Sequence, residues 1–262
     1  MKHYFRVYKT LLKLNLSRLL VYRSNFFNTV VSSIAYGIFS FLFIILLTAK
    51  TPVVYGWKRE ELILVMAFYN IVIGGVFHMI FSYNFNEFAD TIHFGRLDQI
   101  LLKPIDSQFL MTMINTAFAQ LSRFIMGVCV AVYIIYTYNM TITALGLIGF
   151  FILSIFGLLI LYSLWLMVMT LTIWNTRLSN LVDLLYHLND LTRFPPKMYK
   201  PVIKYLFFIF PFTIILITPA KAVLQRLTAI DTMLLLFFSI SLLFLSRRFW
   251  QFALRSYTSA SS

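Results

Sequence analysis

Residues 124–176 read FIMGVCVAVYIIYTYNMTITALGLIGFFILSIFGLLILYSLWLMVMTLTIWNT, and this run contains no Asp, Glu, Lys or Arg. About 20 apolar residues in a helix suffice to cross the ~30 Å hydrocarbon layer of a bilayer. The run is therefore long enough for two crossings, with a turn predicted at Tyr138–Thr141, where the apolar pattern pauses. Because lipid offers the backbone no hydrogen-bond partner, the crossings are predicted to be helices.

Two further stretches, residues 24–49 and 62–86, also lack charged side chains. The chain of 262 residues is 60% hydrophobic and only 12% charged, with a mean hydropathy of +0.84. A soluble core of this size neither needs such a composition nor stays in solution with it. A single cysteine, Cys129, leaves no disulfide framework and no cysteine-based metal site to build. The composition therefore predicts an all-α polytopic membrane protein.

The charges indicate how such a protein is oriented. Basic residues without any acidic neighbour precede the first span, and they are Lys2, Arg6, Lys9, Lys13, Arg18 and Arg23. Arg247, Arg248 and Arg255 follow the last span. Lys and Arg accumulate on the cytoplasmic side of membrane proteins. Both termini are therefore predicted to be cytoplasmic, which requires an even number of crossings, and the net charge of +13 reflects orientation rather than a nucleic-acid partner.

A single domain over residues 1–262 with six transmembrane helices accounts for this pattern. The basic residues of the first segment recur at helical spacing beside an apolar stripe, which predicts an amphipathic helix in the membrane interface over residues 1–23. Five of the spans are predicted at residues 24–49, 62–86, 107–138, 144–174 and 230–249.

The fifth crossing has two candidates. Residues 178–194 are helical in pattern but include Asp183, His187 and Asp190, whereas residues 201–219 are more apolar. Prolines at 201, 211 and 219 break the second candidate into short pieces, a pattern typical of a re-entrant pair of half-helices as well as of a crossing. Both candidates give six spans.

A polar stretch, EFADTIHFGRLDQILLKPID (residues 87–106), lies between the second and third spans, and we call it the island. Gly95 is predicted to close a short helix in the left-handed conformation, and Pro104 to open the next. The island then forms a brief helix lying across the cytoplasmic membrane surface. An ordinary solvated connector is the alternative interpretation.

Several short motifs follow one another along the chain. They are Tyr22–Phe26, Gly95–Gln99 with Leu102–Pro104, Arg193–Pro195, Pro211–Phe212 with Pro219–Ala220, and Tyr257–Ala260. Their order and spacing resemble the permease subunits of ABC-2 type exporters, in an uncharacterised branch with six spans, and the resemblance covers essentially the whole chain. Two positions depart from the branch, because Lys103 stands where arginine is usual and Ser261 where glycine is common.

The resemblance implies that the island is a coupling loop that docks onto a separate ATP-binding subunit, with Phe88, Ile92 and Leu97 as apolar anchors. The coupling residues that it implies are Glu87, Asp90, Gly95, Arg96, Asp98, Lys103 and Pro104. It further implies a second permease subunit, identical or paralogous, a place in the bacterial cytoplasmic membrane, a fifth crossing at 178–194 and a re-entrant hairpin at 197–224. The chain contains no G-x-x-x-x-G-K-[ST] phosphate loop, so ATP and Mg²⁺ are expected on the partner and no cofactor in this chain.

Ionisable residues within the apolar segments are candidates for the pathway or a subunit interface, since lipid exposure of such groups is costly. They are His78, Asp183, His187 and Asp190. The last three lie at i, i+4 and i+7, which puts them on one helical face, a spacing also compatible with a metal site, a proton relay or a wet cytoplasmic helix. His78 is predicted to be a hydrogen-bonded interior residue. Arg123 is predicted to reach the inner headgroups or to pair with an acid.

Two other functions remain open from the sequence. A membrane-embedded, lipid-modifying enzyme would use Asp183, His187 and Asp190, and would need no ATPase. An ion-driven secondary transporter is the third possibility, although such transporters usually show internal repeats, and the sequence shows no convincing one. The transported substrate leaves no spacing pattern to read.

Overall fold

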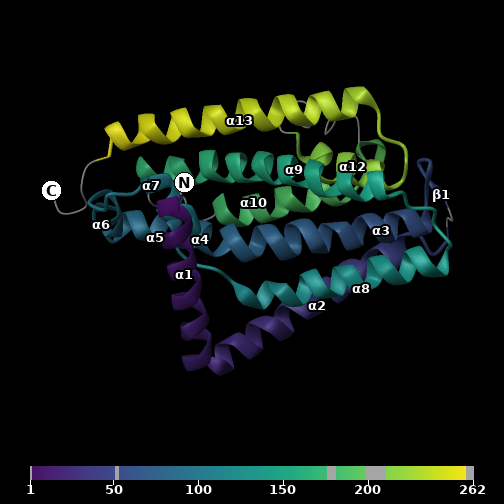
Figure 1. Cartoon of the computed structure of the whole chain (residues 1–262), viewed down its shortest axis with the longest axis horizontal. Helices are drawn as coiled ribbons and strands as arrows, with labels where there is room; N and C mark the ends of the chain where they lie inside the picture. The colour runs from purple at the N-terminus through teal and green to yellow at the C-terminus, as the bar shows by residue number, and fades with distance from the viewer. Residues whose placement is uncertain (1, 51–52, 176–180, 199–210, 258–262) are drawn as a thin grey trace.

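A computed structural model describes residues 2–50, 53–175, 181–198 and 211–257, and shows an elongated bundle of helices (Figure 1). Within these residues, five helices are long and apolar enough to cross a membrane. They are Arg23–Leu47, Arg59–His93, Phe118–Thr137, Ala144–Ile173 and Ala229–Arg255. The chain is therefore a multi-pass, mostly helical membrane protein, as the composition predicted.

The first helix, α1 (Lys2–Val21), stands steeply across the long axis of the bundle, and α2 (Arg23–Leu47) follows it after a sharp corner (Figure 1). Asn15 Nδ2 of α1 donates a hydrogen bond to the Ile114 carbonyl oxygen at 3.0 Å. Arg18 Nη1 donates to Asn115 Oδ1 at 3.2 Å. These bonds fix α1 against the bundle, across the direction of the spans, in the orientation expected of an interfacial helix.

A single long helix forms the centre of the bundle. It comprises α3 (Arg59–Tyr69), the π-helix η1 (Asn70–Ser82), α4 (Tyr83–Asn86) and α5 (Phe88–His93), with Glu87 as the one turn residue. It is the most buried of the five span-length helices. Its 35 residues would span roughly 50 Å at the rise of an α-helix, so it extends beyond a ~30 Å hydrocarbon layer. The helix is longer than the predicted span 62–86 at both ends, because it begins at Arg59 and continues through the first half of the island.

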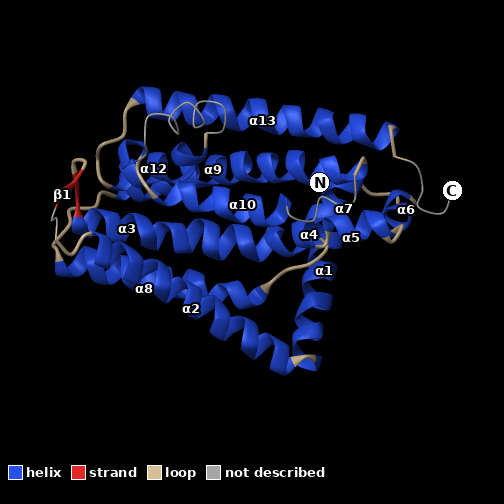
Figure 2. Cartoon of the chain, turned by 180° about the vertical axis from the view of Figure 1, so that it is seen from behind, coloured by secondary structure: helices blue, strands red, loops and turns tan. Residues whose placement is uncertain are grey.

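The two ends of the bundle carry different structures. A hairpin of β1 (Val53–Val54) and β2 (Trp57–Lys58) lies at one end of the bundle, which we call the hairpin end. The helices α5, α6 (Arg96–Leu101) and α7 (Ser107–Met113) lie at the opposite end, which we call the island end (Figure 2). The helix α8 (Leu121–Thr137) begins only after a short 3-10 turn, η2 (Phe118–Gln120).

The prediction of one continuous span over 107–138 was wrong, because Asn84 breaks it. The Asn84 Nδ2 group donates to the carbonyl oxygens of Thr112 and Asn115, both at 2.9 Å, and Asn84 Oδ1 accepts the Asn115 N–H at 2.9 Å. These backbone groups are thereby satisfied outside a helix. The span-length helix starts at Phe118, and α7 stays at the island end.

The remaining helices pack on the other side of the central helix. The helix α9 (Ala144–Thr170) with η3 (Leu171–Ile173) lies between the central helix and α13 (Ala229–Arg255), which forms an outer layer (Figure 1). α13 extends beyond the predicted 230–249. Asn139, with φ 47°, makes the turn that connects α8 to α9.

Neither candidate for the fifth crossing forms a helix of spanning length in the described residues. From 178–194, α10 (Leu181–Asp190) and the 3-10 turn η4 (Leu191–Arg193) are described. From 197–224, α12 (Phe212–Val223) is described at the hairpin end, together with the end of the turn η5 (Pro196–Met198). Residues 199–210, which hold most of the second candidate and the tip of the predicted re-entrant hairpin, lie outside the described part, so the six-span count stays a prediction.

Candidate functional site

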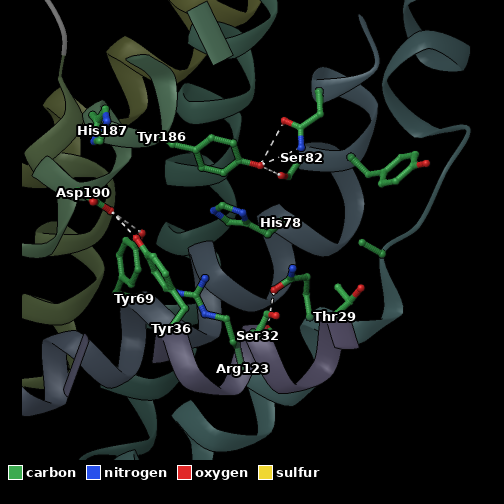
Figure 3. A pocket seen from close by; sticks show the side chains of 15 residues that line it. Thr29, Ser32, Tyr36, Tyr69, His78, Ser82, Arg123, Tyr186, His187 and Asp190 are labelled. Carbon is green, nitrogen blue, oxygen red and sulfur yellow. Dashed lines mark hydrogen bonds between the residues drawn. The ribbon is translucent and has the colours of Figure 1, made fainter. Parts of the chain in front are cut away.

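A polar cavity of about 590 Å³ lies among helices that the composition assigns to the membrane. Its walls come from α2, the central helix, α8 with the residues before it, and α10 (Figure 3). They include Thr29, Ser32, Ser33, Tyr36, Tyr69, His78, Ser82, Tyr83, Asn86, Gln120, Arg123, Tyr186, His187 and Asp190. Polar side chains from four segments therefore converge within an otherwise apolar bundle.

Arg123 is buried in the wall of this cavity, with 4% of its surface exposed, and does not reach the headgroups as predicted. Its guanidinium lies 4.8 Å from the centre of the Tyr36 ring and 5.7 Å from that of Tyr69. Arg123 Nε donates to Asn70 Oδ1 at 3.1 Å. A methyl group added at Gly74 would stand 2.5 Å from the guanidinium carbon, so the glycine provides the space that this side chain occupies.

A second arginine holds the acid of the cavity. Arg193 Nη2 forms an ion pair with Asp190 Oδ1 and donates to the Tyr69 hydroxyl at 3.2 Å. The hydroxyls of Tyr36 and Tyr69 each donate to the same Asp190 oxygen at 3.3 Å (Figure 3). Asp190 is therefore paired with a cation at the cavity wall.

His78 projects from the π-helix into the same space. Its Nε2 atom is buried and has no hydrogen-bond partner within the described residues, so the prediction of a hydrogen-bonded histidine does not hold for this nitrogen. The ring packs on Tyr186, with centroids 5.4 Å apart. The Tyr186 hydroxyl bonds to Ser82 Oγ, which ties α10 to the central helix (Figure 3).

The trio predicted on one face of 178–194 is only partly brought together. His187 and Asp190 line the cavity, whereas Asp183 is exposed and lies outside its lining. The two aspartates share one face of α10 but lie in different environments, because Asp183 is almost two helical turns closer to the island end than Asp190. Within the described residues no group of three His, Cys, Asp or Glu side chains could hold a metal ion.

The island is a compact corner of two short helices. Gly95, with φ 67°, joins α5 to α6 in the left-handed conformation, as the sequence predicted. Pro104 does not open the next helix, because α7 begins at Ser107 and Asp106 caps it by accepting the Phe109 N–H at 3.0 Å. Asp98 lies on α6 and is partly buried.

Asp106 also anchors the island to α13. Arg247 forms an ion pair with it and donates to Gln108 Oε1 at 2.9 Å, and Trp250 Nε1 donates to Ser107 Oγ at 3.2 Å. Partial burial alone would raise the pKa of Asp106, but the hydrogen bonds from Arg247 and from the backbone outweigh it and hold this pKa below its usual value.

The anchors of the island are buried and its outer surface is mixed. Phe88 and Leu97 have no exposed surface and Ile92 is buried, and the Phe88 ring meets Trp250 edge to face at 5.8 Å. Outward-facing residues include apolar Phe94, Leu101 and Leu102 and charged Asp90, Arg96 and Lys103. Glu87 lies 3.8 Å from Arg96 in a largely exposed ion pair.

Sequence reasoning missed the residues that organise the cavity. Tyr36, Tyr69 and Asn70 were hidden in apolar runs, where a tyrosine or a single amide is unremarkable. The adjacent glycines Gly74 and Gly75 were the available signal, since glycine in a helix interior is unfavourable and marks a close approach of another group.

Comparison with protein families identifies the family of this chain. A family model described as "ABC-2 family transporter protein" matches residues 34–261. Comparison with curated proteins and comparison with solved structures each found no match. The matched region contains the island, the cavity lining except Thr29, Ser32 and Ser33, and all five span-length helices except the first part of α2. The chain therefore belongs to the ABC-2 family transporter proteins and is a membrane-spanning permease component of an ABC transporter.

Proposed function

We propose that the chain is the permease subunit of an ATP-binding cassette exporter. In this exporter a separate ATPase docks on the island and drives the opening of a transport pathway that includes the polar cavity. One observation carries the proposal: a single helix runs from the island to the cavity. Phe88 of α5 and His78 of η1 belong to the same continuous element, Arg59–His93. A displacement of the island is thereby delivered to the cavity wall without an intervening loop.

The island is held in the way a lever requires. Its apolar anchors are buried under the bundle, and the Asp106–Arg247 ion pair joins its end to α13. The exposed surface of the island includes apolar Phe94 and Leu102 as well as charged Asp90 and Lys103, a mixture that suits a protein interface. A docked motor would then move α5, α7 and α13 together.

The distribution of charge supports a cytoplasmic island. Arg18, Arg96, Lys103 and Arg247 lie at the island end. At the hairpin end, two of the cations are paired, Arg226 with Glu61 at 2.8 Å and Lys221 with Asp231 at 2.8 Å. By the positive-inside rule we infer that the island end and both termini face the cytoplasm. The resemblance to ABC-2 exporters supports the bacterial cytoplasmic membrane as its location.

The complex contains further subunits. The chain has no phosphate loop, so ATP and Mg²⁺ bind to the ATPase subunits, and a second permease, identical or paralogous, completes the pathway. Tyr186 of α10 contacts Ser82, and Asp190 contacts Tyr69, so α10 ascends beside the central helix from the island end. We assign α10 with η4 to the fifth crossing, and α12 to the returning half of a re-entrant hairpin.

Neither alternative from the sequence is favoured by a specific observation. A lipid-modifying enzyme would need Asp183, His187 and Asp190 together, but Asp183 is outside the cavity and Asp190 is paired with Arg193. An ion-driven transporter needs no motor, and the family of this chain is that of ABC transporters.

The test targets the docking surface. Leu102, with 86% of its surface exposed, is replaced in Leu102→Asp, and Tyr55 at the hairpin end, 63% exposed, is replaced in the control Tyr55→Asp. A side chain that is buried at the centre of a protein interface contributes about 2 kcal/mol or more to the binding free energy. Leu102→Asp should therefore weaken binding of the ATPase, measured by co-purification, by about tenfold or more. Tyr55→Asp should leave it unchanged.

Transport separates coupling from assembly. In proteoliposomes with the ATPase, Leu102→Asp should lose ATP-driven transport while its membrane insertion and melting temperature match those of the unsubstituted chain. The proposal fails if the purified chain brings down no ATP-binding protein, or if Leu102→Asp and Tyr55→Asp reduce transport equally.

A further inference from the structure

We propose that the polar cavity binds the phosphodiester group of an amphiphilic ligand, with Arg123 as its counter-charge. The inference deepens the proposed function, since it assigns a ligand chemistry to the pathway, but it can be tested without any ATPase.

The charge of the cavity is not balanced by the protein. All nine acidic residues of the chain lie in the described part, and five of them form ion pairs with described cations, which are Arg96, Arg193, Lys221, Arg226 and Arg247. No ion pair within the described residues involves Arg123. Arg123, Arg193 and Asp190 together leave the cavity with one net positive charge. A buried charge of this kind is strongly disfavoured unless an anion or water compensates for it.

Two nitrogen atoms in the cavity wall are available to a ligand. Arg123 Nη2 and His78 Nε2 have no hydrogen-bond partner within the described residues, and the two side chains are only 4% and 7% exposed. The Nε–Asn70 bond and the space over Gly74 fix the guanidinium in place. In Figure 3 the His78 ring lies between Tyr186 and Arg123, on the cavity side of the central helix. The fixed, desolvated Arg123 Nη2 donor suits an oxyanion, and His78 Nε2 adds a second donor in the tautomer that carries its proton there.

The number of charges selects the oxyanion. A phosphodiester carries one negative charge at neutral pH and neutralises the single excess positive charge. A phosphomonoester carries about 1.5 to 2 negative charges and would leave the cavity net negative. A carboxylate has the right charge but fewer oxygen atoms, and the Thr29 and Ser32 hydroxyls at the cavity wall add donors that a phosphodiester can use.

A series of cavities connects Arg123 to the membrane interface. A second cavity of about 310 Å³ shares Thr29, Tyr83 and Ala117 with the first and extends to Arg18 on the interfacial helix. Leu19, Phe26 and Phe118 give it apolar walls. A third, also about 310 Å³, shares Arg18 and Tyr83 with the second and adds Arg96 and Lys103. Arg18, Arg96 and Lys103 therefore line the cavities nearest the island, Arg123 lines the innermost one, and the apolar walls of the second cavity accommodate an acyl chain.

The experiment measures binding to the full chain, delipidated in a maltoside detergent that carries no phosphate. Isothermal titration calorimetry compares dihexanoyl phosphatidylglycerol, uncharged dihexanoylglycerol, a short-chain fatty acid and glycerophosphoglycerol, the headgroup without acyl chains. The phosphodiester lipid should bind saturably, and the uncharged diglyceride should bind at least about tenfold more weakly, the cost of losing one charge-assisted contact.

Variants locate the site. Arg123→Gln should weaken binding of the phosphodiester lipid by about tenfold or more. Gly74→Ala, which keeps the arginine but fills its space, should weaken it as well. The matched control is Arg248→Gln, which removes another arginine lying over an aromatic ring, 5.0 Å from the Phe244 centroid, but on the exposed face of α13. Its binding should be unchanged.

Each outcome has a defined meaning. Equal affinity for glycerophosphoglycerol and for the lipid would support the phosphodiester site but overturn its assignment to an amphiphile, because the acyl chains would then add nothing to binding. Equal affinity for the fatty acid, or equal binding by Arg123→Gln and Arg248→Gln, would overturn the inference. Failure of binding in a chain that still co-purifies with an ATPase would remove this inference alone and leave the proposed function standing.

Discussion

The island end and the polar cavity use charged residues in opposite ways. At the island end, Arg247 is matched to Asp106, and the ion pair closes a corner that also includes Gln108 and the Trp250–Ser107 bond. In the cavity, the buried Arg123 lies over two tyrosine rings and has no acidic partner in the part of the chain that the structure describes. The first arrangement fixes helices relative to one another, and the second leaves charge and donors for something else.

The contrast suggests a division of labour that a transporter needs. A part that transmits force has to be rigid, so its polar groups are satisfied within the protein. A part that receives cargo has to remain incomplete until cargo arrives, at some cost in stability. Substitutions in the two regions should therefore differ in the sign of their effect on stability.

The largest effect is expected at the joint between the two regions. Asn84→Leu removes the amide that satisfies the carbonyl oxygens of Thr112 and Asn115 and the Asn115 N–H, in a site that is 3% exposed. Leaving such groups unpaired should cost about 2–4 kcal/mol of unfolding free energy. Unfolding in mixed detergent micelles measures it. Asn25→Leu, an exposed asparagine on α2, is the control and should cost less than about 0.5 kcal/mol.

The next effect concerns the ion pair of the island. Arg247→Met should destabilise the chain by about 1–2 kcal/mol, because the pair is bidentate but partly exposed. Asp106→Asn isolates the same contact, since asparagine still caps α7. A double-mutant cycle should show that the two losses are not additive, and additive losses would contradict the role of the pair.

The pH dependence of the same pair has a defined sign. The pKa of Asp106 is lowered in the folded chain, so its stabilisation is fully present above the unfolded pKa of about 3.9 and is lost as pH falls through the folded value. Acid unfolding of Asp106→Asn should therefore lack this contribution, and the two proteins should approach each other in stability only below about pH 4.

A smaller effect of opposite sign is expected in the cavity. Arg123→Met removes an uncompensated charge, whose desolvation outweighs the cation–π contacts and the bond to Asn70, and should stabilise the ligand-free chain by about 1 kcal/mol. The melting temperature of the delipidated protein in maltoside measures this. A loss of stability as large as that of Arg247→Met would show that the protein itself compensates for the Arg123 charge.

The sequence predicted the island end better than it predicted the cavity. Span-length helices and the left-handed Gly95 were predictable, because apolar length and glycine at a turn are local signals. The break before Phe118 was not, since it depends on Asn84, about 30 residues away. The residues of the cavity were predicted only in part. His78, His187 and Asp190 were identified, but their neighbours Tyr36 and Tyr69 come from separate apolar runs that only the tertiary structure brings together.

The smallest effect on stability is expected for Glu87→Gln, and it provides the most selective test of the division. The Glu87–Arg96 pair is 3.8 Å long and both side chains are largely exposed, so its loss should change the unfolding free energy by less than about 0.5 kcal/mol. The same substitution alters the charge of the surface on which we propose that the ATPase docks. It should therefore lower ATP-driven transport by several-fold while melting remains unchanged. Equal transport by Glu87→Gln and the unsubstituted chain would show that the Glu87 charge takes no part in docking and would leave the apolar residues Phe94 and Leu102 as the docking surface.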